Sequence, residues 1–165
     1  MTILMKTVSV VLILSPVIIF TKLATNDEDL PTEETVVCIK NLTQCINSVL
    51  LDPNVENGNL LLKSLYEYYN NFDDIYWMMK ENDNDKKKRG FYYAKQVLDY
   101  GMPSLLLKSV NFDHLKVRFE WNDRSVQELY DVIKSMKALR ENVEFLYNEL
   151  TFDDFDFGTD QPPDY

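Results

Sequence analysis

The longest regular hydrophobic pattern covers residues 124–150. Apolar residues recur there at spacings of three and four, no glycine or proline intervenes, and Arg140 is the one position that breaks the pattern. A 3.6-residue period kept over this length predicts an amphipathic helix with a broad buried face. Ser125 and Glu128 form the capping-box pattern that begins many helices. The predicted inward positions are Val126, Leu129, Ile133, Met136, Val143, Tyr147 and Leu150.

This predicted helix is long for the chain that carries it. At the usual rise per residue it spans about 40 Å, which is more than a compact helical domain of this size needs. Two interpretations of its apolar face follow. Either the helix is the core of a single bundle, or a second chain covers part of it.

A second helical pattern occupies residues 36–51. Thr32 and Thr35 both stand where a hydroxyl side chain can cap its first turn. Residues 52–59 contain proline, glycine and three asparagines, a composition typical of a loop. Asn59, at the end of this loop, is the predicted cap of the helix that follows.

Residues 60–79 again repeat apolar side chains at helical spacing. The pair at positions 70 and 71, both asparagine, leaves open whether this is one helix or two. Residues 80–90 are strongly hydrophilic and are predicted to form a loop. The basic run at 86–89 is interpreted either as a solvated part of that loop or as a nuclear-localisation or heparin-type patch.

The segment before the long helix is less regular. Residues 91–100 predict a helix that ends at Gly101. Ser104 is the predicted cap of a further helix over 105–112. Residues 114–121 alternate apolar and polar side chains, as a strand does, but a single strand would have no partner. We therefore expect a helix or an extended connector there, and the predicted fold class is all-α.

The N-terminal 24 residues have the features of a secretory signal peptide. Lys6 precedes an apolar run over residues 7–20, which is too short to cross a bilayer comfortably, and Ala24 lies near the expected cleavage site. A retained signal anchor is the alternative. We expect a protein that is secreted, extracellular and without membrane insertion once the signal is removed.

The rest of the chain is predicted to contain one helical domain, residues 25–150, and an acidic flexible tail, residues 151–165. Phenylalanines between the aspartates of the tail leave a docking segment as the alternative. The full chain has 17 basic and 27 acidic residues. Removing Lys6 and Lys22 changes the net charge to 15 − 27 = −12, so we expect no nucleic-acid partner.

Three residues are candidates for covalent modification. Asn41 begins the N-x-[ST] sequon Asn-Leu-Thr, which predicts a glycan in a secreted protein. Cys38 and Cys45 are seven residues apart, and on one continuous helix their Cα atoms would be about 10 Å apart, too far for a disulfide. They are therefore expected to pair between two chains, to lie where the helix is broken, or to stay free.

The sequence contains little that indicates catalysis. His114 is the single histidine, so the chain has no H-E-x-x-H metal motif, and it lacks a P-loop and the G-x-S-x-G motif of hydrolases. We therefore predict that the protein is not an enzyme and needs no cofactor or metal. A small secreted helical protein of this kind is expected to be a signalling ligand or a carrier.

Three segments, in this order, resemble the interferon gamma family. They are 56–62 (ENGNLLL), 91–95 (FYYAK) and 142–150 (NVEFLYNEL), and they are most similar to the divergent interferon gamma-related cytokines of fish. The family usually carries a basic cluster after its last helix. This chain instead has Asp153, Asp154 and Asp156 there.

The resemblance implies a six-helix interferon gamma-like cytokine fold, an intertwined homodimer and a class II cytokine receptor as partner. It also implies a receptor surface on the first long helix and the loop after it, including Asn57, Gly58 and Asn59. The expected role is a secreted cytokine that brings receptor chains together in immune or antiviral defence. A monomeric four-helix cytokine of another family and a secreted helical carrier remain alternatives.

Overall fold

The computed structural model describes residues 30–149, which form six α-helices and one 3-10 helix and contain no β-strand. The predicted all-α class is confirmed. The predicted signal peptide (1–24) and acidic tail (151–165) lie outside the described residues. The elements are α1 (Glu33–Leu51), η2 (Val55–Asn57), α2 (Gly58–Met79), α3 (Asn84–Tyr100), α4 (Ser104–Leu107), α5 (Phe112–Arg118) and α6 (Asp123–Glu149).

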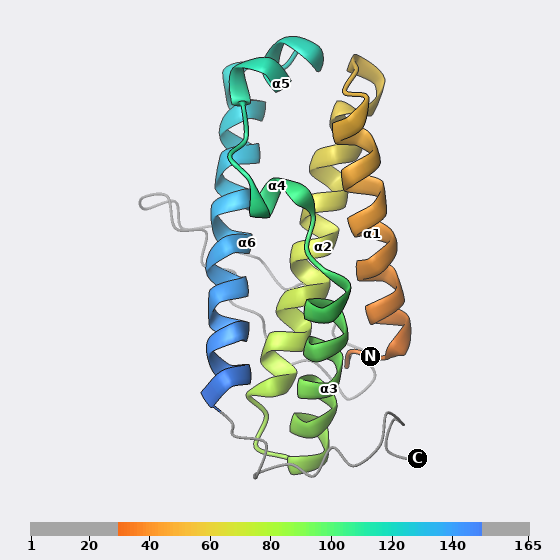
Figure 1. The fold of residues 1–165 in the computed structure, drawn as a ribbon, viewed down its shortest axis with the longest axis vertical. Coiled ribbons are helices and arrows are strands. Elements are labelled where there is room, and N and C mark those ends of the chain that lie inside the picture. The colour runs from red at the N-terminus through yellow and green to blue at the C-terminus, as the bar shows by residue number, and fades with distance from the viewer. Residues whose placement is uncertain (1–29, 150–165) are drawn as a thin grey trace, which may run out of the picture.

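Four long helices lie side by side along the long axis of the molecule, and α4 and α5 form the connection from α3 to α6 (Figure 1). α1 and α3 run in one direction and α2 and α6 in the other, so the chain passes up, down, up and down (Figure 1). Short connections favour such antiparallel neighbours. α2 contacts α1, α3 and α6 and is the central helix of the bundle.

The centre of the bundle is built on one face of α2. Its buried side chains recur at spacings of four and three, as in helices that pack along their whole length. Asn70 is exposed and Asn71 is only partly buried, so the asparagine pair does not interrupt this face and α2 is a single helix. The buried α2 residues of this stripe are Leu61, Leu65, Tyr68, Phe72, Ile75 and Met79.

The start of α6 differs from the predicted one. The helix begins at Asp123, and the side chain of Asn122 accepts a hydrogen bond from the backbone N–H of Ser125 over 2.9 Å. The prediction of a capping box at Ser125 was wrong because the first turn starts earlier. Glu128 instead forms an ion pair with Arg124, with 3.1 Å between Arg124 Nε and Glu128 Oε1.

One chain buries most of the apolar face of α6. Met136 is 1 % exposed and Val143 is fully buried against residues of the same chain. Val126 and Tyr147 are partly buried, and Leu150 lies outside the described residues. This burial agrees with the single-bundle interpretation of the helix. The buried α6 residues are Leu129, Val132, Ile133, Met136, Leu139 and Val143.

The corner between α2 and α3 is shorter than predicted. The prediction of a loop over 80–90 was wrong, because α3 begins at Asn84. The Asp83 carboxylate caps the helix and accepts hydrogen bonds, each of 2.9 Å, from the backbone N–H groups of Asp85 and Lys86. These bonds hold the pKa of the Asp83 carboxyl below its usual value. The basic run at 86–89 therefore lies on the first turns of α3.

Gly90 allows α3 to approach the end of α2. A Cβ atom at Gly90 would stand 2.6 Å from the backbone nitrogen of Met79, closer than atoms can pack. Hydrophilic composition alone predicted a loop here. The helix forms because a capping carboxylate and this close approach fix its start.

The predicted end of α3 is confirmed at Gly101, whose φ of 95° lies in the left-handed region that favours glycine. The prediction of a helix over 105–112 was wrong, because α4 has only four residues. Pro103, not Ser104, occupies its cap position. The backbone N–H of Ser104 donates to Asn47 Oδ1 of α1 over 2.8 Å, which ties this connection to the bundle.

The alternating segment at 114–121 contributes to a helix, α5, and not to a strand. Leu115 and Phe119 are buried four residues apart, whereas Val117 between them is 75 % exposed. Burial therefore follows the helical period. Asn111 begins α5 by accepting a hydrogen bond from the backbone N–H of His114 over 2.9 Å.

Candidate functional site

The turn between α1 and α2 is held by the side chains of two asparagines. Asn54 Oδ1 accepts from the backbone N–H groups of Glu56 and Asn57, over 3.1 and 3.2 Å. In return, Asn57 Oδ1 accepts from the backbone N–H of Asn54 over 3.0 Å. Asn57 Nδ2 also donates to the carbonyl oxygen of Asp52. This reciprocal arrangement satisfies the backbone groups of a surface turn and fixes its shape.

The same turn packs against the connection between α5 and α6. A Cβ atom at Gly58 would stand 2.7 Å from Trp121 Nε1 and 3.1 Å from Phe119 Cβ, so only glycine allows this approach. Arg118 adds a hydrogen bond from its Nε to the carbonyl oxygen of Pro53, over 3.0 Å. The turn is therefore held both by its own asparagine side chains and by contacts with the connection between α5 and α6.

The three residues of the predicted receptor surface have different environments. Gly58 is buried beneath Phe119 and Trp121. Asn57 is partly buried and uses its side chain within its own turn. Asn59 is exposed, and it lies inside α2, so the prediction that it caps this helix was wrong. Among the three, Asn59 is the one exposed to solvent.

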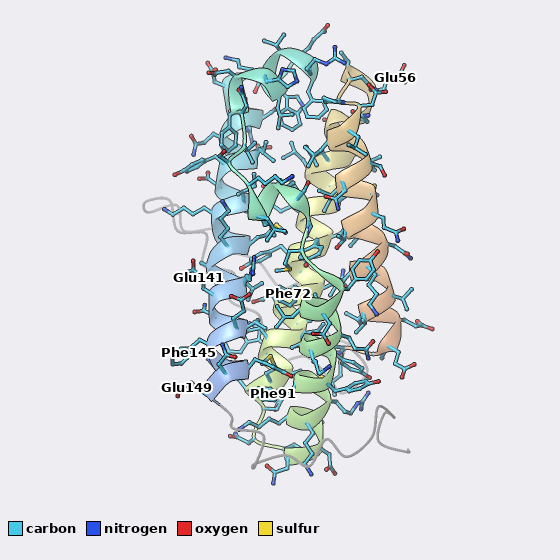
Figure 2. The ribbon with its side chains drawn as sticks, viewed as in Figure 1. Glu56, Phe72, Phe91, Glu141, Phe145 and Glu149 are labelled. Atoms are coloured by element: carbon cyan, nitrogen blue, oxygen red, sulfur yellow. The ribbon has the colours of Figure 1, made fainter. Side chains whose placement is uncertain are left out.

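Apolar side chains that sequence analysis did not single out are exposed at this end of the molecule. Leu51, the last residue of α1, is 87 % exposed, and Val55 in η2 is 52 % exposed. Asp52 and Glu56, both exposed, lie next to them in the chain, and Figure 2 shows Glu56 at the tip of the bundle. Hydrophobicity predicts burial, so their exposure is detected only once the fold is known. We call Leu51, Asp52, Val55, Glu56 and Asn59 the tip surface.

The predicted glycosylation site lies on the solvent side of α1. Asn41 is exposed, as attachment of a glycan requires. Thr43, the third residue of the sequon, is buried, and its hydroxyl donates to the carbonyl oxygen of Ile39 over 2.9 Å. The glycan position is thus compatible with the fold.

Both cysteines lie on the unbroken helix α1, and within the described chain neither is in a disulfide. Cys38 is exposed, and partial burial raises the pKa of its thiol, with a further contribution from the Glu67 carboxylate. Cys45 is partly buried, and its Sγ lies 3.5 Å from Ser64 Oγ of α2. Of the two, Cys38 is the more accessible to a second chain.

A groove of about 400 Å³ lies on the surface between α6 and the chain that leads into α5. Phe112 and Tyr130 meet at one side, with ring centroids 5.8 Å apart. The groove combines apolar walls with two lysines and one glutamate. The lining residues are Val110, Phe112, Tyr130, Ile133, Lys134, Lys137, Ala138 and Glu141.

Residues 30–149 contain no group of three or more histidine, cysteine, aspartate or glutamate side chains placed to hold a metal ion. None of the helices in this range is both long enough and apolar enough to cross a membrane. Comparison with known proteins gave no match to a family, to a curated protein or to a solved structure.

Proposed function

We propose that this chain is a secreted helical cytokine that binds class II cytokine receptor chains and brings them together to signal in immune or antiviral defence. The tip surface carries the proposal. Its backbone is fixed by Asn54 and Asn57, and it presents the apolar side chains of Leu51 and Val55 to solvent. The resemblance to interferon gamma points to the same region as the receptor surface.

The geometry of the tip suits recognition of a protein. A turn that is already ordered loses little conformational entropy when it binds. Leu51 and Val55 would enter apolar pockets of the receptor, and Asp52 and Glu56 would form part of the polar rim. The activity is binding, with no chemical step.

The homodimer that the resemblance implies is part of this proposal. Because each chain buries most of the α6 face by itself, two folded copies would associate through surface residues without exchanging helices. The exposed Cys38 on α1 is one place where they could be linked.

The alternative of a monomeric four-helix cytokine has one observation for it and one against it. Burial of the α6 face within one chain favours a monomer. The up-down-up-down order of the long helices differs from the up-up-down-down order of the growth hormone type of cytokine (Figure 1).

The carrier alternative rests on the groove along α6. Its volume of about 400 Å³ falls within the range of small-molecule sites, and its lining is mainly apolar. Lipid that co-purifies with the secreted protein and is lost in a Tyr130→Asp variant would favour this function. A protein that binds receptor without retained lipid would exclude it.

Secretion can be tested separately from receptor binding. Mass spectrometry of protein from the culture medium is expected to show an N-terminus near residue 25 and a glycan on Asn41. An Asn41→Gln variant should lose the glycan mass and keep the N-terminus. Protein that stays in the cell with Met1 retained would contradict the secretory part of the proposal.

Receptor binding is tested with the secreted full chain against a panel of class II cytokine receptor ectodomains. A Leu51→Asp, Val55→Asp variant should bind at least about tenfold more weakly if these side chains are central contacts. Phe145→Ser is the matched control, because Phe145 is a similarly exposed apolar residue at the opposite end of the bundle (Figure 2). Absence of binding to every ectodomain, or equal loss in both variants, would overturn the proposal.

A further inference from the structure

The outward face of α6 carries a stripe of exposed side chains that the receptor proposal does not use. Its members recur at helical spacing, so they share one side of the helix. Tyr130 and Phe145, at its two ends, are 49 % and 61 % exposed. Figure 2 shows Glu141 and Phe145 on the side of α6 away from the other helices. We call the following six exposed residues the outer stripe: Tyr130, Lys134, Lys137, Ala138, Glu141 and Phe145.

The charged residues of the outer stripe are unpaired within the described part of the chain. Elsewhere on α6, Arg140 forms an ion pair with Glu144, with 2.7 Å between Arg140 Nε and Glu144 Oε1. In residues 30–149, Lys134, Lys137 and Glu141 form no ion pair. Exposed charges are usually solvated, so their lack of partners alone indicates nothing. The order in which they occur along the helix does.

The outer stripe is complementary to itself when it is read in the opposite direction. If the α6 helices of two copies lie antiparallel about a two-fold axis between Lys137 and Ala138, Lys134 lies opposite the partner's Glu141. Two-fold symmetry makes this contact occur twice. A shift of one heptad in either direction would set Lys134 or Glu141 against its own copy. Like-charge repulsion therefore selects this register.

The same register brings an aromatic side chain to the groove of each copy. Tyr130 and Phe145 are about 22 Å apart along α6 and equally far from the proposed axis, so Tyr130 faces the partner's Phe145. Tyr130 and Phe112 form one side of the groove, which is mainly apolar. The partner's Phe145 would lie beside these two rings and lose its exposure to water, which is favourable for a large apolar side chain.

The charge of the whole molecule also favours this face for contact between copies. The full chain has a net charge of −10, so two copies repel each other over most of their surfaces. The outer stripe has two lysines and one glutamate, and repulsion is weaker there. A partner of another sequence would have to supply the reversed order of charges and rings, whereas a second copy supplies it by symmetry.

We propose that two copies of the chain pair through the outer stripes of antiparallel α6 helices, with Lys134 against the partner's Glu141 and Phe145 in the partner's groove. This inference rests on the homodimer of the proposed function and gives it a surface. Figure 1 shows α1 and α6 on opposite sides of the bundle, so Cys38 lies outside the contact and no disulfide is needed. A contact between two single helices is small, and the dimer should dissociate on dilution.

Analytical ultracentrifugation of the full secreted chain over a concentration series tests the charge contacts. Lys134→Glu and Glu141→Lys should each raise the dissociation constant of the dimer at least about tenfold, because each variant sets like charges opposite one another twice. Lys63→Glu is the matched control, since it makes the same charge change at an exposed site on α2. It should leave the dissociation constant unchanged. Circular dichroism checks that each variant is folded.

An equimolar mixture of the two stripe variants is the decisive sample. When a Lys134→Glu chain lies antiparallel to a Glu141→Lys chain, opposite charges meet at both contacts. The mixture should therefore form dimers at concentrations where each variant alone is monomeric. A chain with both changes should dimerise as the wild type does, because the pairs are restored with their signs exchanged.

A disulfide across the two-fold axis tests the register. Helices packed about 8–10 Å apart would hold the Cα atoms of Ala138 in the two copies about 5–7 Å apart, a distance that a disulfide spans. In a background of Cys38→Ser with Cys45→Ser, Ala138→Cys should form covalent dimers under mild oxidation. Ser135→Cys should not, because Ser135 is exposed on the same helix but lies outside the stripe.

Four results would overturn the pairing. They are a wild-type chain that stays monomeric at every concentration, a mixture of stripe variants that forms no dimer, and covalent dimers from Ser135→Cys without any from Ala138→Cys. The fourth is a monomer that native mass spectrometry finds with lipid retained and that loses the lipid in Tyr130→Asp, since lipid would then occupy the groove.

Receptor binding distinguishes failure of the pairing from failure of the proposed function. Phe145→Ser should weaken the dimer, yet it should bind a single soluble ectodomain as the wild type does, because the tip surface lies elsewhere (Figure 2). A monomeric wild type that binds ectodomains would overturn only the pairing through α6. A dimer with the predicted charge dependence that binds no ectodomain would overturn only the cytokine proposal.

Discussion

Gly58 lies directly beneath Trp121, at a distance where a Cβ atom would stand 2.7 Å from the indole Nε1. The contact joins the first turn of α2 to the connection that leads into α6. The shape of the tip surface therefore depends on a residue distant in the sequence.

A Gly58→Ala change should destabilise the protein by about 1–3 kcal/mol, because the added methyl group overpacks a buried contact. Thermal unfolding followed by circular dichroism measures the loss. Asn59→Ala, at the exposed neighbouring position, should stay within about 0.5 kcal/mol of the wild type. Equal melting temperatures for the wild type and Gly58→Ala would mean that Trp121 does not press on this site.

Met136 tests whether one chain buries the α6 face. Met136→Asp places an unpaired carboxylate in the core and should cost several kcal/mol, whereas Met136→Leu conserves volume and should cost under about 1.5 kcal/mol. Because Met136 and the other buried α6 residues pack within one chain, dilution that separates a dimer should leave a folded monomer that keeps its helical circular dichroism. Analytical ultracentrifugation gives the mass in parallel. Loss of helical circular dichroism at the dilution where the dimer separates would instead indicate interlocked chains.

Ionisation of Tyr68 should lower the stability of the fold at alkaline pH. Burial raises the pKa of its phenol well above the usual 10, since an ionised ring would lose its solvation, and the Tyr68 hydroxyl contacts Met102 Sδ. When the pKa of a group is higher in the folded state than in the unfolded state, its contribution to stability is fully present below the pKa of the unfolded state. The contribution is lost as the pH rises through the pKa of the folded state. Unfolding free energy should therefore fall above about pH 10.

A Tyr68→Phe variant should lose less stability between pH 10 and 12 than the wild type, as measured by urea unfolding at each pH. Burial also raises the pKa values of Tyr66, Tyr69 and Tyr147, so part of the alkaline loss should remain. Tyr130→Phe, at an exposed site, should follow the wild type. Identical profiles for all three proteins would rule out Tyr68 as the source.

The cysteines should differ in their ability to link two chains. Non-reducing electrophoresis of secreted protein should show a covalent dimer that Cys38→Ser removes. Cys45→Ser should keep it, because Cys45 is packed against Ser64. A dimer lost only in Cys45→Ser would reverse this assignment, and a monomer in every sample would show that both thiols stay free.

Sequence periodicity predicted the long helices well because each buries a continuous apolar face. It could not predict the start of α3, where hydrophilic residues form a helix. The capping carboxylate of Asp83 is a local signal, but the close approach of Gly90 to Met79 is a tertiary contact. Likewise, residues 114–121 alternate like a strand, and only packing of Leu115 and Phe119 selects the helical period.

The candidate site was predicted less completely. The turn composition located the loop between α1 and α2, and Asn57 does hold it. Exposure of Leu51 and Val55 could not be inferred, because apolar residues are normally expected inside. The burial of Gly58 depends on Trp121, whose position is set by the connection into α6.

That connection also determines the order in which the molecule should come apart. α1, α2 and α3 are joined by short turns, whereas α6 returns to α2 only after α4 and α5 (Figure 1). Contacts between sequence neighbours re-form quickly, and those that close a long loop re-form slowly. α6 should therefore open as one cooperative unit while the other three helices stay paired. Native-state hydrogen exchange would then show α6 amides exchanging together, at a lower opening free energy than those of α2.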